Sequence, residues 1–462
     1  MTTDDVSQTL SDFSILFRKM EAVESVPELQ EVKKELHEVK TEVNKDDLEV
    51  VVPGRTVILQ KFNYMRTHLL NTKKNLQLGR DMISMNGIVG KPFGTTFKMV
   101  SDHQNNKCFQ LEVADEVLNF EALFMNGESG EDNRDLVDNE SSQKLSKQEI
   151  IKMREDGVDG KEIVGKLIEN SETFQNKTKF SQAKFLKKKA KKYHQFILVR
   201  KPSIRLLMDI HYKADPMKLM NLRIDSLAQI LNGTNVRSGG KFLVYETGAQ
   251  GIVVASVLER VGANGKVVHI YQTGQPQTNC LSAMNFSQEV LDNLKVINIQ
   301  HLRSLEQGQD ILINRFPLEN GSSLDSGEPP RKKLHSENGQ ENGKSLEKPM
   351  RMNLREQSVE THKILKSDLF DGLIIVCKQH PSSLLTYLAK FIAPSRPFAV
   401  YSPYKEPLLD AYMTVKEAGC AINCILSETW LRHHQVLPER THPTVNMSGG
   451  GGYLLTGIFI EK

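Results

Sequence analysis

The stretch that decides the fold is KFLVYETGAQG, residues 241–251. Mostly apolar residues run into an acid and then into a glycine turn, as in a nucleotide-binding strand that turns into a helix. From there the chain alternates short apolar strands with helical segments as far as YLLTGIFIE, residues 453–461. This alternation predicts an α/β fold, with a doubly wound, mostly parallel Rossmann-like sheet in a domain over residues 205–462.

A long break interrupts the series at residues 318–350, which are rich in Gly, Ser, Asn and charge and contain almost no apolar side chains. We expect a disordered insert that loops out of the sheet domain. Lys332 and Lys333 follow Pro-Pro-Arg in this insert and are a weak match to a nuclear import signal. The expected location is the nucleus, and whether this motif directs import stays open.

The chain before residue 205 divides into three segments. Residues 1–46 place apolar side chains at three- and four-residue spacings among charges, which predicts a helical extension. Residues 47–130 hold short β-rich runs separated by Gly and Pro, which predict a small β-barrel domain or, as the alternative, a β-sandwich. Residues 131–204 predict a helical, basic linker, in which Ser146 and Glu149 have the spacing of a capping box.

The composition excludes several classes of protein. The chain is 39% hydrophobic, yet no window approaches the roughly 18 apolar residues of a membrane helix, so we expect no membrane contact. Five cysteines without a CxxC pair argue against a disulfide framework. Cys420 and Cys424 lie in an apolar context with no further ligands in sight, so we expect no metal.

The glycine turn departs from the pattern that binds S-adenosylmethionine, acid-x-Gly-x-Gly-x-Gly. Glu246 and Gly248 are in register, but Gln250 and Ile252 occupy the next two glycine positions, and Gly251 is one residue out of phase. The glycines of such a turn allow close approach of the ligand and of the helix, and side chains fill that space here.

The second strand also lacks the acid that would accept hydrogen bonds from the ribose hydroxyls, because it ends in His-Ile-Tyr-Gln at residues 269–272. Two independent defects at one site predict that this chain binds no cofactor. The alternative is a divergent methyltransferase that is active in its own right with an unusual cofactor pose.

A basic run covers residues 177–201, with ten lysines or arginines, no acid, and interleaved aromatic residues. Such a run is often only a solvated helix face. Its lack of acids favours contact with the phosphates of an RNA instead. The residues that we assign to RNA backbone contact are Lys184, Lys187, Lys188, Lys189, Lys191 and Lys192.

Several ordered motifs together make a specific resemblance: ENSETF, ILVRKPS, LVYETGAQG, APSRPFAVY, SETWLR and MSGGGGYLLTG. Over residues 47–462 the chain resembles the non-catalytic subunits of the eukaryotic tRNA adenine-N1 methyltransferases. The resemblance implies a tRNA partner, and a related catalytic subunit that binds S-adenosylmethionine and methylates an adenine of the T-loop. It further implies a heterotetramer in which this chain scaffolds and binds tRNA. Residues 1–46 fall outside it.

The resemblance also provides a test of catalytic competence. Catalytic relatives keep an aspartate at the end of the fourth strand, in a run like Leu-Asp-x-Pro, where this chain has Cys377 and Lys378. Asp371 starts that strand at the opposite end and is interpreted as a cap. We therefore expect no catalytic residue, and we expect Lys378 to reach RNA phosphates or the active site of the adjoining subunit.

Two further features have open interpretations. The glycine run at residues 449–452 requires positive φ or a close backbone approach, or else forms a mobile loop. Trp430, the only tryptophan, belongs to the core or to an interface. A coiled-coil interaction protein is a third functional alternative, but it depends on residues 5–45 alone.

Overall fold

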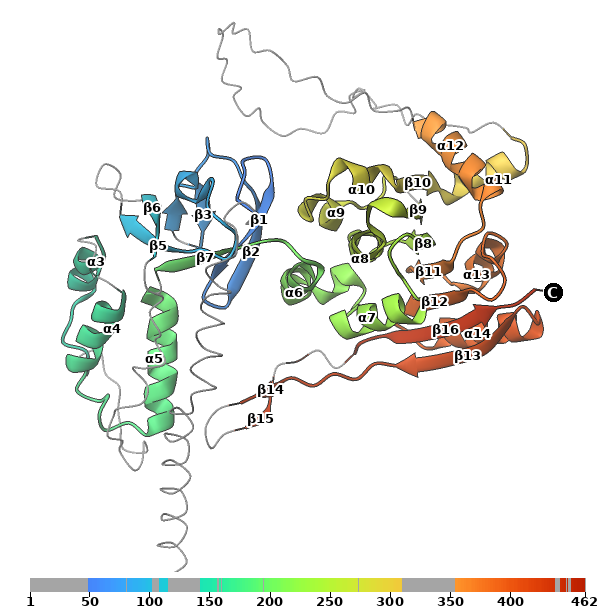
Figure 1. The fold of residues 1–462 in the computed structure, drawn as a ribbon. Helices are drawn as coiled ribbons and strands as arrows, with labels where there is room; N and C mark the ends of the chain where they lie inside the picture. The colour runs from blue at the N-terminus through green and yellow to red at the C-terminus, as the bar shows by residue number, and fades with distance from the viewer. Residues whose placement is uncertain are drawn as a thin grey trace, which may run out of the picture. The chain divides into compact units, whose positions relative to one another are not determined.

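The computed structural model describes residues 49–79, 81–101, 108–114, 142–155, 158, 160–193, 195–272, 274–309, 354–436, 441–445, 447 and 450–461. The predicted helical extension and the predicted disordered insert lie outside these residues. The described chain forms two compact units (Figure 1). One comes from residues 1–64 and 70–201, and the other from residues 65–69 and 202–462.

Six strands of the first unit belong to a seven-stranded sheet in the order β2-β1-β7-β5-β6-β4-β3, in which residues 65–69 of the edge strand β2 are assigned to the second unit. The strands are β1 Thr56–Lys61, β2 Tyr64–Leu69, β3 Leu76–Leu78, β4 Asp81–Ile83, β5 Thr96–Ser101, β6 Cys108–Val113 and β7 Phe196–Arg200. Leu59 and Phe97 are fully buried in its core. Among the described strands no pairing joins β2 to β3, so the expected closed β-barrel is not confirmed.

Strand β7 differs from the sequence-based expectation, which placed its residues in the linker. It lies between β1 and β5 and pairs antiparallel with both, for example Ile58 with Arg200 and Phe97 with Ile197. The local sequence gives no signal that β7 joins this sheet, because its partners β1 and β5 lie far earlier in the chain. The chain therefore returns to the first sheet before it enters the second unit.

Among the described residues between β6 and β7, three helices follow one another: α3 Lys147–Glu155, α4 Gly160–Glu169 and α5 Lys179–Tyr193. The predicted capping box is confirmed: the amide of Ser146 donates to Oε2 of Glu149 at 2.8 Å, and the amide of Glu149 donates to Oγ of Ser146 at 3.2 Å. The helices share a small core made of Ile163, Val164, Leu167, Phe174, Leu186 and Tyr193.

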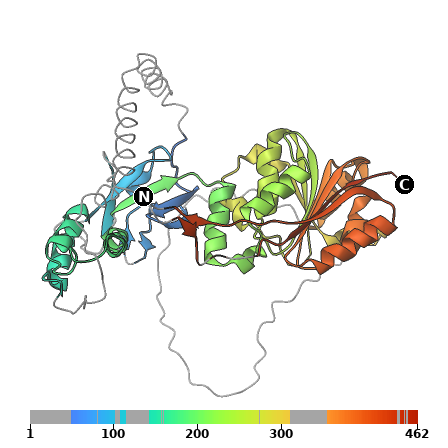
Figure 2. The same ribbon diagram turned by 90° about the horizontal axis from the view of Figure 1, so that it is seen from below.

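The second unit confirms the predicted doubly wound sheet. Its strand order is β10-β9-β8-β11-β12-β16-β13, in which the first five are parallel and β16 runs antiparallel to both neighbours (Figures 1 and 2). The strands are β8 Lys241–Glu246, β9 Lys266–Tyr271, β10 Leu294–Asn298, β11 Gly372–Val376, β12 Pro397–Ser402, β13 Ala421–Glu428 and β16 Tyr453–Phe459.

Helices cover both faces of this sheet. They are α6 Ile204–Ala214, α7 Ile224–Gly233, α8 Ile252–Val261, α9 Asn279–Ala283, α10 Gln288–Asp292, α11 Ile299–Glu306, α12 Leu354–Ser367, α13 Ser382–Ala389 and α14 Glu406–Glu417. Leu243 and Tyr245 of β8 pack into a core shared with α11 to α14. Phe242 and Val244 alternate with them and are equally buried, so the central strand has no solvated face.

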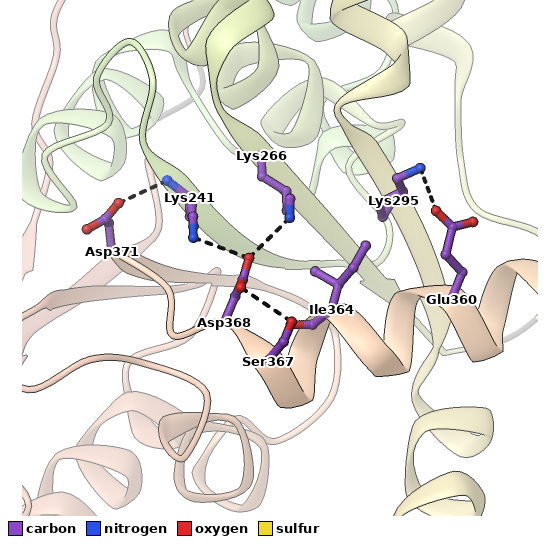
Figure 3. Close-up of polar contacts among 8 residues, drawn as sticks. All are labelled: Lys241, Lys266, Lys295, Glu360, Ile364, Ser367, Asp368 and Asp371. Carbon is purple, nitrogen blue, oxygen red and sulfur yellow. Dashed lines mark hydrogen bonds and ion pairs between the residues drawn. The ribbon is translucent and has the colours of Figure 1, made fainter.

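Ion pairs fasten the amino ends of the strands to the segment after α12 (Figure 3). The carboxylate of Asp368 accepts from Nζ of Lys241 at 3.2 Å and from Nζ of Lys266 at 3.1 Å. These two hydrogen bonds hold the pKa of Asp368 below its usual value, and the one from Lys266 has the larger effect. Asp371 accepts from the amide of Lys241 at 3.0 Å, which confirms that it is a cap at the edge away from the glycine turn.

Gly160 provides a test of the helical packing in the first unit. A Cβ at Gly160 would overlap the carbonyl oxygen of Tyr193, whereas a Cβ at Gly165 on the same helix would meet nothing within 4 Å. We expect Gly160→Ala to destabilise the α4–α5 pair by about 1–3 kcal/mol, as overpacking does. Gly165→Ala should instead stabilise α4 by roughly 0.5–1 kcal/mol. Amide hydrogen exchange across α4 and α5 measures both, and equal protection in the two variants would contradict the close packing.

Candidate functional site

The glycine turn lies where β8 ends and α8 begins, beside the end of β11. The parallel strands run outward from this point in both directions, so it is the topological switch point at which ligands bind in such sheets. Gly248, Gln250 and Gly251 all have positive φ, at 93°, 60° and 76°. Gln250 thus adopts a left-handed conformation that non-glycine residues seldom take.

Glu246, the acid of the turn, serves the fold. Its side chain is buried, and Oε2 accepts from the amide of Val254 at 2.9 Å, in the first turn of α8. Burial raises the pKa of Glu246 to about 7, against the effect of the backbone amides that favour its ionised form. The side chain of Glu246 therefore caps the amino end of α8.

The side chain of Gln277 accepts hydrogen bonds from the backbone amides of the turn. Its Oε1 accepts from the amide of Gly248 at 3.1 Å and from the amide of Gln250 at 3.0 Å. The carbonyl oxygen of Gln277 lies so close to Gly251 that a Cβ there would overlap it. Cys280 adds a bond from its amide to the carbonyl of Gln250 at 3.1 Å. Amides that such a turn offers to a bound ligand are satisfied here within the chain.

Lys378 covers the same turn from the end of β11. A Cβ placed on Gly248 would lie 2.9 Å from Cε of Lys378, so the lysine stem rests on the glycine, and the residue is otherwise exposed. Cys377 before it is buried, and burial raises the pKa of its thiol to about 12. No carboxylate therefore stands at the end of β11, where the catalytic relatives are expected to carry one.

The end of β9 holds an amide in the place of an acid. Oε1 of Gln272 accepts from the hydroxyl of Tyr245 at 3.2 Å, and its carbonyl accepts from Nδ2 of Asn298 at 2.8 Å. These bonds give Gln272 partners inside the sheet domain. Neither Gln277 nor Tyr245 carried a recognisable sequence signal, because each acts through a contact formed only in the folded chain.

The predicted RNA-binding lysines lie on α5, and the structure separates them into two groups. Five have exposed side chains: Lys184, Lys187, Lys188, Lys191 and Lys192. Within the described ranges no ion pair involves any of these five. Lys189 is half-buried, with Nζ 5.0 Å from the centre of the Phe185 ring, and burial and then Lys192 and Lys188 lower its pKa. Lys189 thus packs along the helix side that contacts the rest of the unit.

The basic face of α5 is held firmly in its unit. Helix α5 ends at Tyr193 and β7 begins at Phe196, so the helix continues almost directly into a central strand. Between them, Oε1 of Gln195 accepts from the amide of Gly160 at 3.2 Å, and its Nε2 donates to the carbonyl of Val158 at 3.4 Å. The exposed lysines are therefore presented on a fixed surface.

Two glycines of the run, Gly451 and Gly452, make close backbone approaches. Gly452 has a φ of 73°, and a Cβ there would overlap the hydroxyl of Tyr401. A Cβ on Gly451 would lie 2.5 Å from Nη2 of Arg223. The expected positive φ or close backbone approach is therefore confirmed for Gly451 and Gly452, whereas Gly450 shows neither. Trp430 is 75% exposed, so the core alternative is wrong, and the interface alternative stays a prediction.

The described residues include no group of three or more His, Cys, Asp or Glu side chains arranged to hold a metal ion. Cys420 is half-buried, with Sγ 3.7 Å from the carbonyl oxygen of Val415. Nor does any helix among the described residues have the length and apolar character needed to cross a membrane.

Comparisons with known proteins give one consistent set of relatives. The model of the Gcd10p family matches residues 50–338. The tRNA (adenine(58)-N(1))-methyltransferase non-catalytic subunit TRM6 of Mus musculus is 33% identical over 88% of this chain and 88% of its own length. The protein of the same name in Dictyostelium discoideum is 31% identical over 90% of this chain and 81% of its own length.

Solved structures give weaker likenesses. An S-adenosylmethionine-dependent O-methyltransferase from Thermotoga maritima has a TM-score of 0.47 at 10% identity, over 91% of this chain and 98% of its own. The tRNA (m1A58) methyltransferase TrmI from Aquifex aeolicus has a TM-score of 0.43 at 10% identity, over 90% of this chain and all of its own.

The hydrogen bonds from the turn amides to Gln277 lead to a prediction about cofactor binding. Calorimetric titration of the full chain alone with S-adenosylmethionine should give no binding heat, because Gln277 holds the turn amides and no acid stands at the ends of β9 and β11. Heat that fits a micromolar site on the isolated chain would contradict this expectation.

Proposed function

The chain belongs to the Gcd10p family, and on that premise we propose that it is the non-catalytic, tRNA-binding and scaffolding subunit of a tRNA adenine-N1 methyltransferase. A related catalytic subunit binds S-adenosylmethionine and transfers the methyl group, and this chain holds the RNA and supports the assembly. The observation that carries the proposal is the glycine turn, whose amides of Gly248 and Gln250 both donate to Gln277.

The alternative, a divergent methyltransferase with its own activity, needs groups that the chain lacks. Gln272 and Cys377 stand where a ribose-binding acid and a catalytic acid are expected. The amide oxygen of Gln272 carries no charge and already accepts from the hydroxyl of Tyr245, and the buried thiol of Cys377 is only a weak acceptor, so neither group equals a carboxylate at its position. The non-catalytic role is therefore favoured.

Binding of tRNA is assigned to the exposed face of α5. Lys184, Lys188 and Lys191 are spaced at four and three residues, so they line one side of the helix. Their ammonium groups contact phosphates through charge, without reading bases, as suits recognition of a folded RNA by shape. Lys187 and Lys192 extend this face, and Lys189 supports it from its half-buried position.

Exposed apolar side chains support the proposal that this chain binds a protein partner. Trp430, Val436 and Val445 are 75%, 76% and 87% exposed, and all three lie between β13 and β16. We assign this segment to the interface with the catalytic subunit, in a heterotetramer located in the nucleus. The motif with Lys332 and Lys333 lies outside the described residues and is an import signal in this proposal.

The assignment of α5 is tested by charge reversal. We expect Lys188→Glu together with Lys191→Glu to weaken tRNA binding by the assembled complex at least about tenfold at physiological salt, and to lower the salt slope by roughly one unit per lysine. Fluorescence anisotropy of labelled tRNA at several salt concentrations measures both quantities.

The matched control reverses Lys363 and Lys366, two exposed lysines at the same spacing on α12. This control changes the net charge by the same amount and should leave tRNA affinity almost unchanged. Equal losses in the two double variants would mean that only total charge matters, and no loss in the α5 variant would make its lysines an ordinary solvated face.

Lys378 offers a separate test at the turn. Lys378→Met keeps an apolar stem over Gly248 and removes the charge, and Lys378→Ala removes both. We expect each variant to lower single-turnover methylation of tRNA by the intact complex at least several-fold, since a charge-assisted contact is worth about 1.5–3 kcal/mol. Full activity of Lys378→Met in a complex of normal size would show that the ammonium group has no role.

A further inference from the structure

Residues 429–436, 441–445, 447 and 450–452 are the described part of the segment between β13 and β16, and they form an arm that extends beyond the sheet (Figures 1 and 2). The chain leaves the sheet after Glu428 and returns at Tyr453, and these two residues pair with one another. Further out, β14 His434–Gln435 pairs antiparallel with β15 His442–Pro443. The arm is thus a two-stranded extension whose two ends meet at one root.

The outgoing strand of the root is held by buried polar groups from the start of α7. Nη2 of Arg223 donates to the carbonyl oxygen of Thr429 at 2.9 Å. Arg223 is 6% exposed, and its guanidinium is oriented by Asp225 through bonds of 3.0 and 2.9 Å. Charge-assisted hydrogen bonds of this paired kind restrict geometry more than neutral ones do.

The returning strand is held by the same region. Oγ of Ser226 donates to the carbonyl oxygen of Gly451 at 2.9 Å and lies 2.7 Å from Oγ1 of Thr429. Because the serine proton goes to Gly451, the hydroxyl of Thr429 donates to Ser226. The hydroxyl of Tyr401 lies 3.2 Å from the carbonyl oxygen of Gly451 and 3.0 Å from that of Met220, and shares its proton between them.

The glycines of the root are those that this packing requires. Gly451 has no room for a methyl group, since a Cβ would lie 2.5 Å from Nη2 of Arg223 and 2.6 Å from Oγ1 of Thr429. Gly452 is excluded both by its positive φ and by Tyr401. Gly450 differs, because a Cβ there would meet nothing within 4 Å and its φ is not positive.

We propose that Arg223, Ser226 and Tyr401 form a latch that joins both strands of the root and makes the arm a preformed docking element for the catalytic subunit. The first part concerns this chain alone, and the docking part rests on the proposed function. A rigid arm loses less conformational entropy on binding than a loop that must be ordered, so the latch increases affinity without contacting the partner. The three are positioning residues that act through the backbone of Thr429 and Gly451.

The sequence provides its own probe of the latch. Trp430 is the only tryptophan and follows Thr429 directly, so the intrinsic fluorescence of the full chain reports motion at the root. Time-resolved anisotropy should show slow overall tumbling in the wild type and in Gly450→Ala. Gly451→Ala should add a nanosecond component, the timescale of loop motion. Ser226→Ala, which removes hydrogen bonds without adding bulk, should do the same and serves if Gly451→Ala fails to fold.

The same variants are then tested for assembly with the related catalytic subunit. We expect Gly451→Ala and Ser226→Ala to bind it on the order of tenfold more weakly than Gly450→Ala does. Unchanged anisotropy in Gly451→Ala and Ser226→Ala would overturn the latch. Altered anisotropy with unchanged affinity would overturn its role in docking. A wild-type chain that does not bind the catalytic subunit at all would contradict the proposed function and leave the anisotropy result valid.

Discussion

Each backbone amide of a glycine turn can donate one hydrogen bond. In this chain, two of these hydrogen bonds go to the side chain of Gln277. Gly248 and Gln250 both donate to its Oε1. A cofactor that uses these two amides would have to break both hydrogen bonds. A buried or ligand-facing amide needs a partner, and a partner built into the chain keeps the turn ordered without any ligand. The other features of the sheet domain are consistent with a fold that needs no bound cofactor.

Several groups that would face a ligand elsewhere support the fold here. Glu246 caps α8, Gln272 bonds to Tyr245, and the stem of Lys378 lies on Gly248. The doubly wound sheet has five adjacent parallel strands followed by β16 and β13, so the domain presents edges and loops for assembly. In our proposal, the lysine face of α5 binds tRNA, and the arm between β13 and β16, with its exposed apolar side chains, binds the catalytic subunit.

Features encoded by local pattern could be predicted from the sequence. The parallel sheet followed from alternating apolar strands and helices, the capping box from the spacing of Ser146 and Glu149, and the irregular turn from the phase of Gly251. Features that depend on distant contacts could not. Strand β7 inserts between strands far earlier in the chain, Gln277 meets the turn only after folding, and Lys189 leaves the solvated face because α5 packs along that side. Tertiary contacts decided each of these positions.

The central claim, that this chain contributes RNA contact and leaves the cofactor to a related subunit, is tested most directly by photo-crosslinking on the assembled complex. The complex is irradiated with labelled tRNA and labelled S-adenosylmethionine, and the adducts on each chain are mapped by mass spectrometry. We expect tRNA adducts within residues 179–193 of this chain and cofactor adducts only on the catalytic subunit. Cofactor adducts within residues 241–280 of this chain would contradict the claim.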